Sequence, residues 1–205
     1  MTLLRRAHLP EATELLVRAF DEDPYFRFLA PDTKTRARLV GGVMSSYLAL
    51  ALPRSVARVV LTDEQELRGI CLWYPPEAYP APAHEIARVY TSVIGPALLK
   101  RHLSATTILN ALRMGQLLEE AQPDGPHYYL QVLGVDPRWH GRGTGSALLR
   151  ERLAEADAAG LPAMLETTKP MNVRLYRRYG FEIVRTTKSD SSPPVWTMVR
   201  PAQTT

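Results

Sequence analysis

One stretch of the chain, residues 128–149, constrains the fold more than any other. It begins as an apolar, β-prone run and breaks at the turn pair Asp136-Pro137. A helical pattern opens at Ser146, and three alternating glycines precede it: Gly141, Gly143 and Gly145. Glycines between a strand and a helix let backbone N–H groups approach a ligand, and the helix start adds a partial positive charge. The stretch therefore predicts a strand–loop–helix unit that binds a pyrophosphate or another anion.

Two common phosphate-binding motifs do not fit this spacing. A P-loop needs Lys and then Ser or Thr after its last glycine, but here Gly145 is followed by Ser146-Ala147. The dinucleotide fingerprint needs G-x-G-x-x-G, whereas the glycines here are spaced G-x-G-x-G. The loop is therefore expected to serve another anionic ligand.

The stretch resembles the acyl-CoA loop of the GCN5-related N-acetyltransferase (GNAT) family. In that family Q/R-G-x-G-x-G/A follows a strand that ends in V-x-P. Val135-Asp136-Pro137 matches the strand end, and residues 140–145 match the loop. His140 stands where the family usually has Gln or Arg. Because phosphate contacts in such a loop come mainly from backbone N–H groups, we expect this change to be tolerated.

A second motif follows the first in the order that the family shows. Residues 172–182 match the family signature N-x-x-x-Y-x-x-x-G-F, with Asn172 and Tyr176 at the defined positions. One helical pattern and the strand Ala163–Thr168 separate the two motifs, a crossover that favours parallel strand pairing. The likeness is close over residues 128–184 and looser over the N-terminal third.

The resemblance implies a single GNAT domain over residues 1–205. Its fold would be α/β (α+β), with a central twisted mixed sheet, a splayed strand pair and helices on both faces. A length of 205 residues with 45% hydrophobic content suits one domain with a full core. Helical spacing also predicts an insertion at about 77–122.

The N-terminal third reads as strand, helix, helix and a strand hairpin. Asp32 or Thr33 can cap the second helix, and Pro53 stops it. The expected strands are Thr2–Arg6, Ser55–Thr62 and Leu67–Tyr74.

Composition narrows the cellular setting and the partners. No run is apolar and long enough to span a membrane, no signal segment opens the chain, and the single Cys71 fits a reducing cytoplasm. The net charge of +4 is spread among mixed charges, which argues against a nucleic-acid partner. The histidines lack metal-ligand spacing, so no metal is expected. The sequence leaves open whether the protein is a monomer or a homodimer.

The resemblance implies acetyl-CoA as the cofactor, lying between the strand that ends at Val135 and the strand Ala163–Thr168. Backbone groups freed by the splay would bond the pantetheine arm, and the glycine loop would hold the pyrophosphate. Asn172 resembles a cofactor-binding residue of the family, although a plain helix cap explains it equally well. The residues expected to bind acetyl-CoA are Leu133, Gly134, Val135, His140, Gly141, Arg142, Gly143, Thr144, Gly145, Ser146, Asn172 and Tyr176.

Acetyl transfer from a thioester to an amine needs a neutral amine, a stabilised oxyanion and protonation of the leaving thiolate. Tyr176 matches the family tyrosine beside the sulfur and is the expected acid, although buried aromatic residues on helices often serve only the core. Glu166 is the best carboxylate candidate for the base; a structural glutamate is the alternative. The residues expected near the acceptor amine are Glu22, Asp23, Tyr129 and Gln131. A solvated helix end is the simpler explanation of the acidic run at 21–23.

These features together predict an enzyme, an acetyl-CoA-dependent N-acetyltransferase that acts on a primary amine of a small molecule by direct attack on the thioester. Leu165-Glu166-Thr167, the Asn172 helix and the helical insertion resemble puromycin N-acetyltransferase and its relatives, which makes an antibiotic a candidate acceptor. Two alternatives stay open at this point. The acceptor can be a protein lysine or N-terminus, or the chain can be a non-catalytic acyl-CoA-binding regulatory module.

Overall fold

The structure is a computed structural model that describes residues 1–78, 125–188 and 192–203, and the single residues 82, 84, 85, 87, 91 and 109. Most of the helical insertion predicted at about 77–122 lies outside the described residues.

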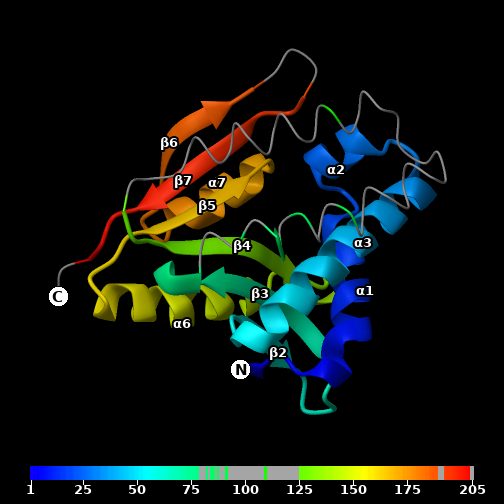
Figure 1. The fold of residues 1–205 in the computed structure, drawn as a ribbon, viewed down its shortest axis with the longest axis horizontal. Coiled ribbons are helices and arrows are strands. Elements are labelled where there is room, and N and C mark those ends of the chain that lie inside the picture. Colours follow the sequence, from blue (N-terminus) through cyan, green and yellow to red (C-terminus); the bar gives the residue numbers. More distant parts are fainter. Residues whose placement is uncertain are drawn as a thin grey trace.

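A seven-stranded sheet forms the centre of the described part of the chain, in the order β1-β2-β3-β4-β5-β7-β6 (Figure 1). Its strands are β1 (Thr2–Leu3), β2 (Ala57–Leu61), β3 (Leu67–Tyr74), β4 (Tyr128–Val135), β5 (Ala163–Thr167), β6 (Glu182–Thr187) and β7 (Val195–Arg200). Strands β4 and β5 pair in parallel, and the other neighbouring strands pair antiparallel. The predicted hairpin β2–β3 and the predicted parallel crossover are therefore both confirmed.

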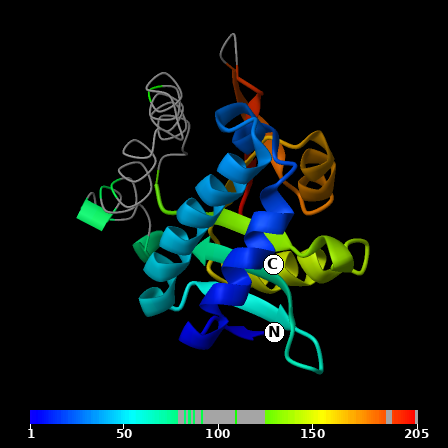
Figure 2. The same ribbon diagram turned by 90° about the vertical axis from the view of Figure 1, so that its right-hand side faces the viewer.

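Helices cover both faces of this sheet. The α-helices are α1 (Leu9–Phe20), α2 (Pro24–Leu29), α3 (Thr33–Ala51), α6 (Thr144–Ala158) and α7 (Pro170–Arg177). In the described ranges, short 3₁₀ turns accompany them: η1 (Arg6–His8), η2 (Leu52–Arg54), η3 (Pro76–Ala78) and η4 (Pro137–Trp139). Helices α1 and α3 lie on one face, whereas α6 and α7 lie on the other (Figures 1 and 2). The mixed sheet with helices on both faces is the predicted fold.

Aspartate caps set the starts of two N-terminal helices. Asp32 Oδ1 accepts a hydrogen bond from Thr35 N at 2.8 Å at the start of α3, as predicted. Asp23 accepts hydrogen bonds from the backbone N–H groups of the first turn of α2, and Pro24 occupies the first position of that helix. The acidic run at 21–23, for which a solvated helix end was the simpler explanation, therefore leads from the end of α1 into a second, short helix.

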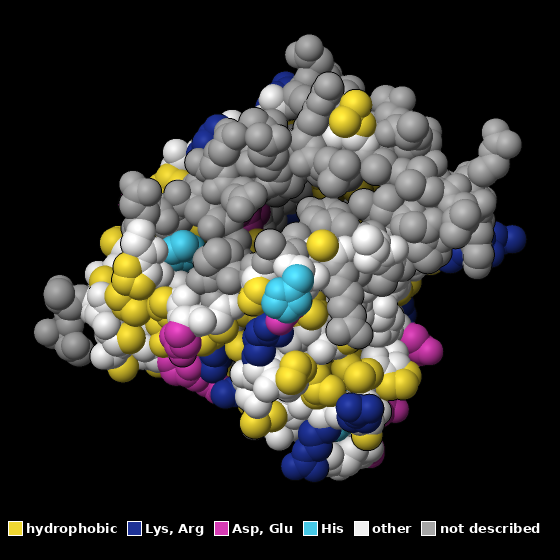
Figure 3. Space-filling model, in the orientation of Figure 1, with side chains coloured by type: hydrophobic (Ala, Val, Ile, Leu, Met, Phe, Trp, Pro, Cys, Tyr) yellow, Lys and Arg dark blue, Asp and Glu magenta, His cyan; other side chains and the backbone are white. Residues whose placement is uncertain are grey.

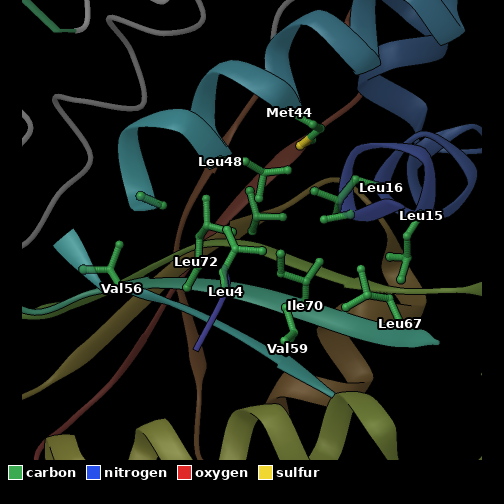
Figure 4. Packing of buried hydrophobic residues seen from close by; sticks show 14 of the residues in the cluster. Leu4, Leu15, Leu16, Met44, Leu48, Val56, Val59, Leu67, Ile70 and Leu72 are labelled. Atoms are coloured by element: carbon green, nitrogen blue, oxygen red, sulfur yellow. The ribbon is translucent and has the colours of Figure 1, made fainter. Parts of the chain in front are cut away.

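Two apolar clusters join these layers. On one face Leu15 and Leu16 of α1 and Leu48 of α3 pack over Ile70 and Leu72 of β3, all of them fully buried (Figure 4). On the other face α6 and α7 cover a second cluster, which contains Leu130, Leu148, Leu165, Val173, Tyr176 and Phe181. Burying each such leucine stabilises the fold by about 2 kcal/mol before conformational entropy is counted. Strand β4 contributes to both clusters and is thus fixed from both sides.

Candidate functional site

Strands β4 and β5 separate partway along their length. Their parallel ladder contains the pairs Tyr128–Ala163, Tyr129–Met164 and Leu130–Leu165 and then ends. Strand β4 continues to Val135, and β5 continues to Thr167 with its other edge paired to β7 (Figure 1). Within the described part of the chain, the β5 side of residues 131–135 therefore has no strand partner. Its backbone groups are available to an extended ligand, except that the Val135 carbonyl already accepts a bond from His140.

A β-bulge lies at the point where the two strands part. Leu72 pairs with Val132 and Trp73 pairs with Leu130, so Gln131 is the extra residue on β4. The bulge interrupts the alternation of side chains, and Tyr129 and Val132 both pack against the α1/α3 cluster. Tyr129 and Gln131 were both expected near the acceptor amine, but β4 lacks the regular alternation that would place two residues at this spacing on one face. The Gln131 Oε1 atom is buried and has no hydrogen-bond partner.

Two glycines of the loop have positive φ angles, and the space around them is open. Gly141 and Gly143 have φ angles of +74° and +78°, and a Cβ atom at either would meet nothing within 4 Å. Such φ angles favour glycine. Gly143 is the N-cap residue of α6, which begins at Thr144, two residues earlier than the sequence pattern indicated. Free N–H groups of the first helical turn thus face an open loop, an arrangement that fits a pyrophosphate. His140 Nε2 donates to the Val135 carbonyl at 3.1 Å and ties the loop back to β4.

A buried carboxylate anchors the junction between β4 and this loop. Asp136 has no exposed surface, and its Oδ2 atom accepts from Arg18 Nη2 of α1 at 2.7 Å. Its Oδ1 accepts from the backbone N of Arg138 at 3.0 Å and from Nε of Arg138 at 3.1 Å. Burial alone would raise the pKa of Asp136, but the bonds from Arg138 and Arg18 outweigh it and lower the pKa to about 2. The carboxylate therefore stays ionised and fixes the loop against α1.

Glu166 and Tyr129 form a polar pair at the point where the strands separate. The Tyr129 hydroxyl donates to Glu166 Oε2 at 2.8 Å, between residues on neighbouring strands. Burial raises the pKa of Glu166 to about 7, and the hydrogen bond from Tyr129 only partly opposes this shift. A carboxyl group with such a pKa exchanges a proton readily near neutral pH.

Tyr176 lies on the other face of the sheet, in the cluster under α6 and α7. Its ring makes an edge-to-face contact with Phe181, with the centroids 5.9 Å apart. Burial raises the pKa of its hydroxyl above the usual range, and the described residues supply that hydroxyl with no hydrogen-bond partner. The phenol therefore stays protonated and retains a proton to donate.

Asn172 does not cap α7, because the cap position belongs to Lys169. Its Nδ2 atom instead donates to Thr167 Oγ1 at the end of β5, at 3.4 Å. The cap explanation is therefore wrong, and the side chain links α7 to the splayed strand.

The acidic run at 21–23 has three different surroundings. Asp23 is buried and also accepts from the Thr168 hydroxyl, at 3.0 Å to Oδ2, which joins the start of α2 to the end of β5. Glu22 is exposed and pairs with Arg27. Asp21 pairs with Arg36, whose side chain is buried. The run thus lies beside the β5 end of the site, but Asp23 is already engaged in structural bonds.

Sequence reasoning missed three elements that position this site. They are the Arg18–Asp136 ion pair, the Asp23–Thr168 bond and strand β7. The first two join residues far apart in the sequence and leave no local signal. Strand β7 did have one, the apolar run at 195–199.

The described surface and side chains carry few signs of other ligands. Among the described residues no group of three or more His, Cys, Asp or Glu side chains could hold a metal ion. The same residues include no helix with the length and apolar character needed to cross a membrane. On the face shown in Figure 3, positive and negative side chains of the described residues are interspersed rather than gathered by sign.

Comparisons with known proteins agree with this geometry. The family model described as Acetyltransferase (GNAT) family matches residues 5–181. An uncharacterized N-acetyltransferase of Schizosaccharomyces pombe is 24% identical over 203 residues, covering 95% of this chain and 80% of the relative. A Corynebacterium glutamicum crystal structure described as histone acetyltransferase HPA2 and related acetyltransferase has a TM-score of 0.66 at 24% identity, with 100% and 96% of the two chains covered. Arylalkylamine N-acetyltransferase 2 of Aedes aegypti has a TM-score of 0.64 at 11% identity, with 98% of each chain covered. The chain belongs to the GNAT family and is an N-acetyltransferase of a family that uses acetyl-CoA.

Proposed function

We propose that the protein transfers the acetyl group of acetyl-CoA to a primary amine of a small molecule, which attacks the thioester directly. The observation that carries this proposal is the pair of Glu166 and Tyr129 at the separation of β4 and β5. There, a partly buried carboxyl group whose pKa is raised to about 7 lies next to the unpaired edge of β4.

Glu166 is the proposed base. A pKa of about 7 leaves roughly half of the carboxyl groups ionised at neutral pH, and an ionised group of this basicity can take a proton from an ammonium ion or from the attacking amine. Tyr129 holds the Oε2 atom of the carboxylate in place through its hydroxyl. The proton is therefore removed from the amine on the α1/α3 side of the sheet.

Tyr176 is the proposed acid. Leu165 packs in the same cluster as Tyr176, on the α6/α7 face of the sheet. Glu166 follows Leu165 on β5, so the Glu166 side chain points to the opposite face. Base and acid thus approach the gap between the strands from opposite sides. This arrangement suits a reaction in which the amine enters on one side and the thiolate leaves on the other.

The residues present fit acetyl-CoA, which supplies an activated thioester. The unpaired β4 edge at Leu133 and Val135, on either side of Gly134, offers backbone bonds to the pantetheine arm. The loop and the first turn of α6, residues 140–146, offer N–H groups to the pyrophosphate. Asn172 supports β5 through Thr167 and lies beside the same gap.

Polar groups on β4 and beside the end of β5 favour a small cationic acceptor. Among the described residues the buried Gln131 Oε1 atom has no hydrogen-bond partner, so an amine N–H that bonded to it would satisfy this polar atom. Glu22 adds an exposed carboxylate near the end of β5, whereas Asp23 serves to cap α2. The name of the Aedes aegypti structure concerns small amines and that of the Corynebacterium glutamicum structure concerns histones. The position of Glu166 within the sheet, where its side chain is only partly exposed, supports the first kind of acceptor.

A panel of acceptors tests the proposal through CoA release. Arylalkylamines, polyamines, aminoglycosides and puromycin are compared with lysine-containing peptides at equal concentration. We expect the highest kcat/KM for a small amine, and a fall in kcat of roughly 100-fold in Glu166→Gln. Glu182→Gln, which changes an exposed glutamate of β6, is the matched control and should keep full activity. A clear preference for peptides would contradict the small-molecule proposal, and unchanged turnover in Glu166→Gln would remove Glu166 from the mechanism.

A further inference from the structure

Three side chains beside the glycine loop bring two cations onto one aromatic ring. Trp139 ends η4, Arg142 lies in the glycine loop, and Arg68 lies on β3. The guanidinium carbon of Arg68 is 4.2 Å from the centroid of the Trp139 ring, and that of Arg142 is 4.8 Å from it. We call these three residues the Arg–Trp–Arg cluster.

The indole of Trp139 is held in place by its surroundings. Its backbone N donates to the Asp136 carbonyl at 2.8 Å, and Asp136 is itself buried and fixed by two arginines. The Nε1 atom of the ring is enclosed by the protein and has no hydrogen-bond partner. An aromatic face attracts guanidinium groups, so the fixed ring also restrains the exposed Arg142 side chain.

The cluster has hydrogen-bond donors and positive charge that the protein leaves unused. In the described part of the chain, neither Arg68 nor Arg142 forms an ion pair or donates a side-chain hydrogen bond. The nearby Arg18 and Arg138 differ, because both are bonded to Asp136. Two like charges that share one ring also repel each other, and an anion bound between them would remove that repulsion.

We propose that the Arg–Trp–Arg cluster binds the ribose 3′-phosphate of acetyl-CoA, as a subsite separate from the pyrophosphate site. This inference rests on the proposed function, in which the backbone of the loop holds the pyrophosphate. The nucleotide end of acetyl-CoA carries a phosphate monoester close to that pyrophosphate, and guanidinium forks bind such a group well. Arg142 connects the two subsites, because its backbone belongs to the loop and its side chain belongs to the cluster.

Binding of CoA and of 3′-dephospho-CoA, measured by calorimetry without an acceptor amine, tests this subsite. We expect the unaltered protein to bind CoA about 10- to 100-fold more tightly than dephospho-CoA, as charge-assisted hydrogen bonds to a phosphate would give. Arg68→Met keeps the side-chain stem but removes the charge. It should lose most of that difference while its affinity for dephospho-CoA is unchanged.

Two further variants separate positioning and general charge from direct binding. Trp139→Leu should lose preference for CoA, whereas Trp139→Phe, which keeps an aromatic face, should retain most of it. Arg178→Met removes a charge from the pocket that Asp157 also lines. That pocket lies at the far end of the 15-residue helix α6, roughly 20 Å from the loop, so the variant should change neither affinity.

The outcomes distinguish this inference from the cofactor assignment. If Arg68→Met weakens both ligands equally, or neither, the cluster does not bind the 3′-phosphate and the inference is wrong. If the unaltered protein binds both ligands with equal affinity, the inference is wrong although the acetyl-CoA site stands. If it binds neither ligand, the proposed acetyl-CoA site itself fails.

Discussion

Arg18 of α1 donates to the buried carboxylate of Asp136 at 2.7 Å, across 118 residues of sequence. This ion pair holds the end of β4, and with it the glycine loop, against the N-terminal helix. The carboxylate is fully enclosed, whereas 43% of the Arg18 side chain is exposed. The pair therefore joins the cofactor side of the site to the α1/α3 layer.

The first prediction concerns the stability that Asp136 provides. Its pKa is lowered from 3.8 to about 2 in the folded protein, so its contribution is present above pH 3.8 and is lost as the pH falls toward about 2. Asp136→Asn should lower the free energy of unfolding by about 2 kcal/mol at pH 7, through the loss of charge-assisted hydrogen bonds. Urea unfolding at pH 7 and pH 3 should show a smaller difference between the two proteins at the lower pH.

A surface ion pair provides the control for Asp136. Glu22→Gln breaks the pair with Arg27, in which both side chains are largely exposed, and should change stability by less than about 0.5 kcal/mol. A difference between Asp136→Asn and the unaltered protein that does not shrink with falling pH would show that the carboxylate charge is not the cause.

The second prediction concerns Gly143. Gly143→Val places a β-branched side chain at a φ of +78°. The side chain would enter space that is open in the structure and that the pyrophosphate occupies in our proposal. Acetyl-CoA should raise the melting temperature of the unaltered protein and not that of the variant. Gly160→Val introduces the same side chain at a φ of +64° beyond the far end of α6, again in open space. It should lose similar intrinsic stability yet keep the shift; loss of the shift in both would point to strain rather than binding.

The third prediction concerns the bond between Tyr129 and Glu166. The kcat/KM should rise with pH through the ionisation of Glu166, near pH 7. Tyr129→Phe removes a hydrogen bond that lowers the pKa of Glu166, so burial acts unopposed and the rising limb should move to higher pH. The pH dependence of kcat/KM measures this directly. A limb that stays in place, or that moves to lower pH, would mean that the limb reports another group.

The fourth prediction concerns Tyr176. Tyr176→Phe keeps the ring contact with Phe181 and removes a hydroxyl that has no hydrogen-bond partner among the described residues. The free energy of unfolding should therefore be unchanged. Turnover should fall by roughly 100-fold while acetyl-CoA binding is unchanged. Tyr179→Phe, in the turn after α7, is the control for a phenol outside the proposed chemistry. Equal turnover in both variants would assign Tyr176 to the core alone.

Local patterns in the sequence predicted most of the fold. The strand Leu67–Tyr74 was predicted with the bounds that the structure has, and the glycine spacing predicted the loop that opens α6. Both features depend on residues close together in the chain. The cap at Asp32 was predicted for the same reason.

The parts that sequence reasoning missed depend on tertiary contacts. The bulge at Gln131 follows from how β3 and β4 pair, and the raised pKa of Glu166 follows from the loss of solvent around its carboxyl group in the fold. Asp23 looked like a solvated acid because its partner Thr168 is 145 residues away. The sequence indicated Glu166 as a candidate base from its place on β5. Its raised pKa could be recognised only in the folded structure.

Strand β7, which holds part of the site, is synthesised after all the other strands of the sheet. Beyond Leu165, β5 no longer has β4 beside it, and Glu166 and Thr167 are paired with Thr197 and Trp196 of β7. Strand β7 follows every other strand of the sheet along the chain, and it lies outside the segment that the family model matches. A nascent chain can therefore assemble the glycine loop and both helical layers while its proposed base still lacks the strand that holds it. On our proposal, catalytic competence would then appear only after residues 195–200 have left the ribosome and paired with β5.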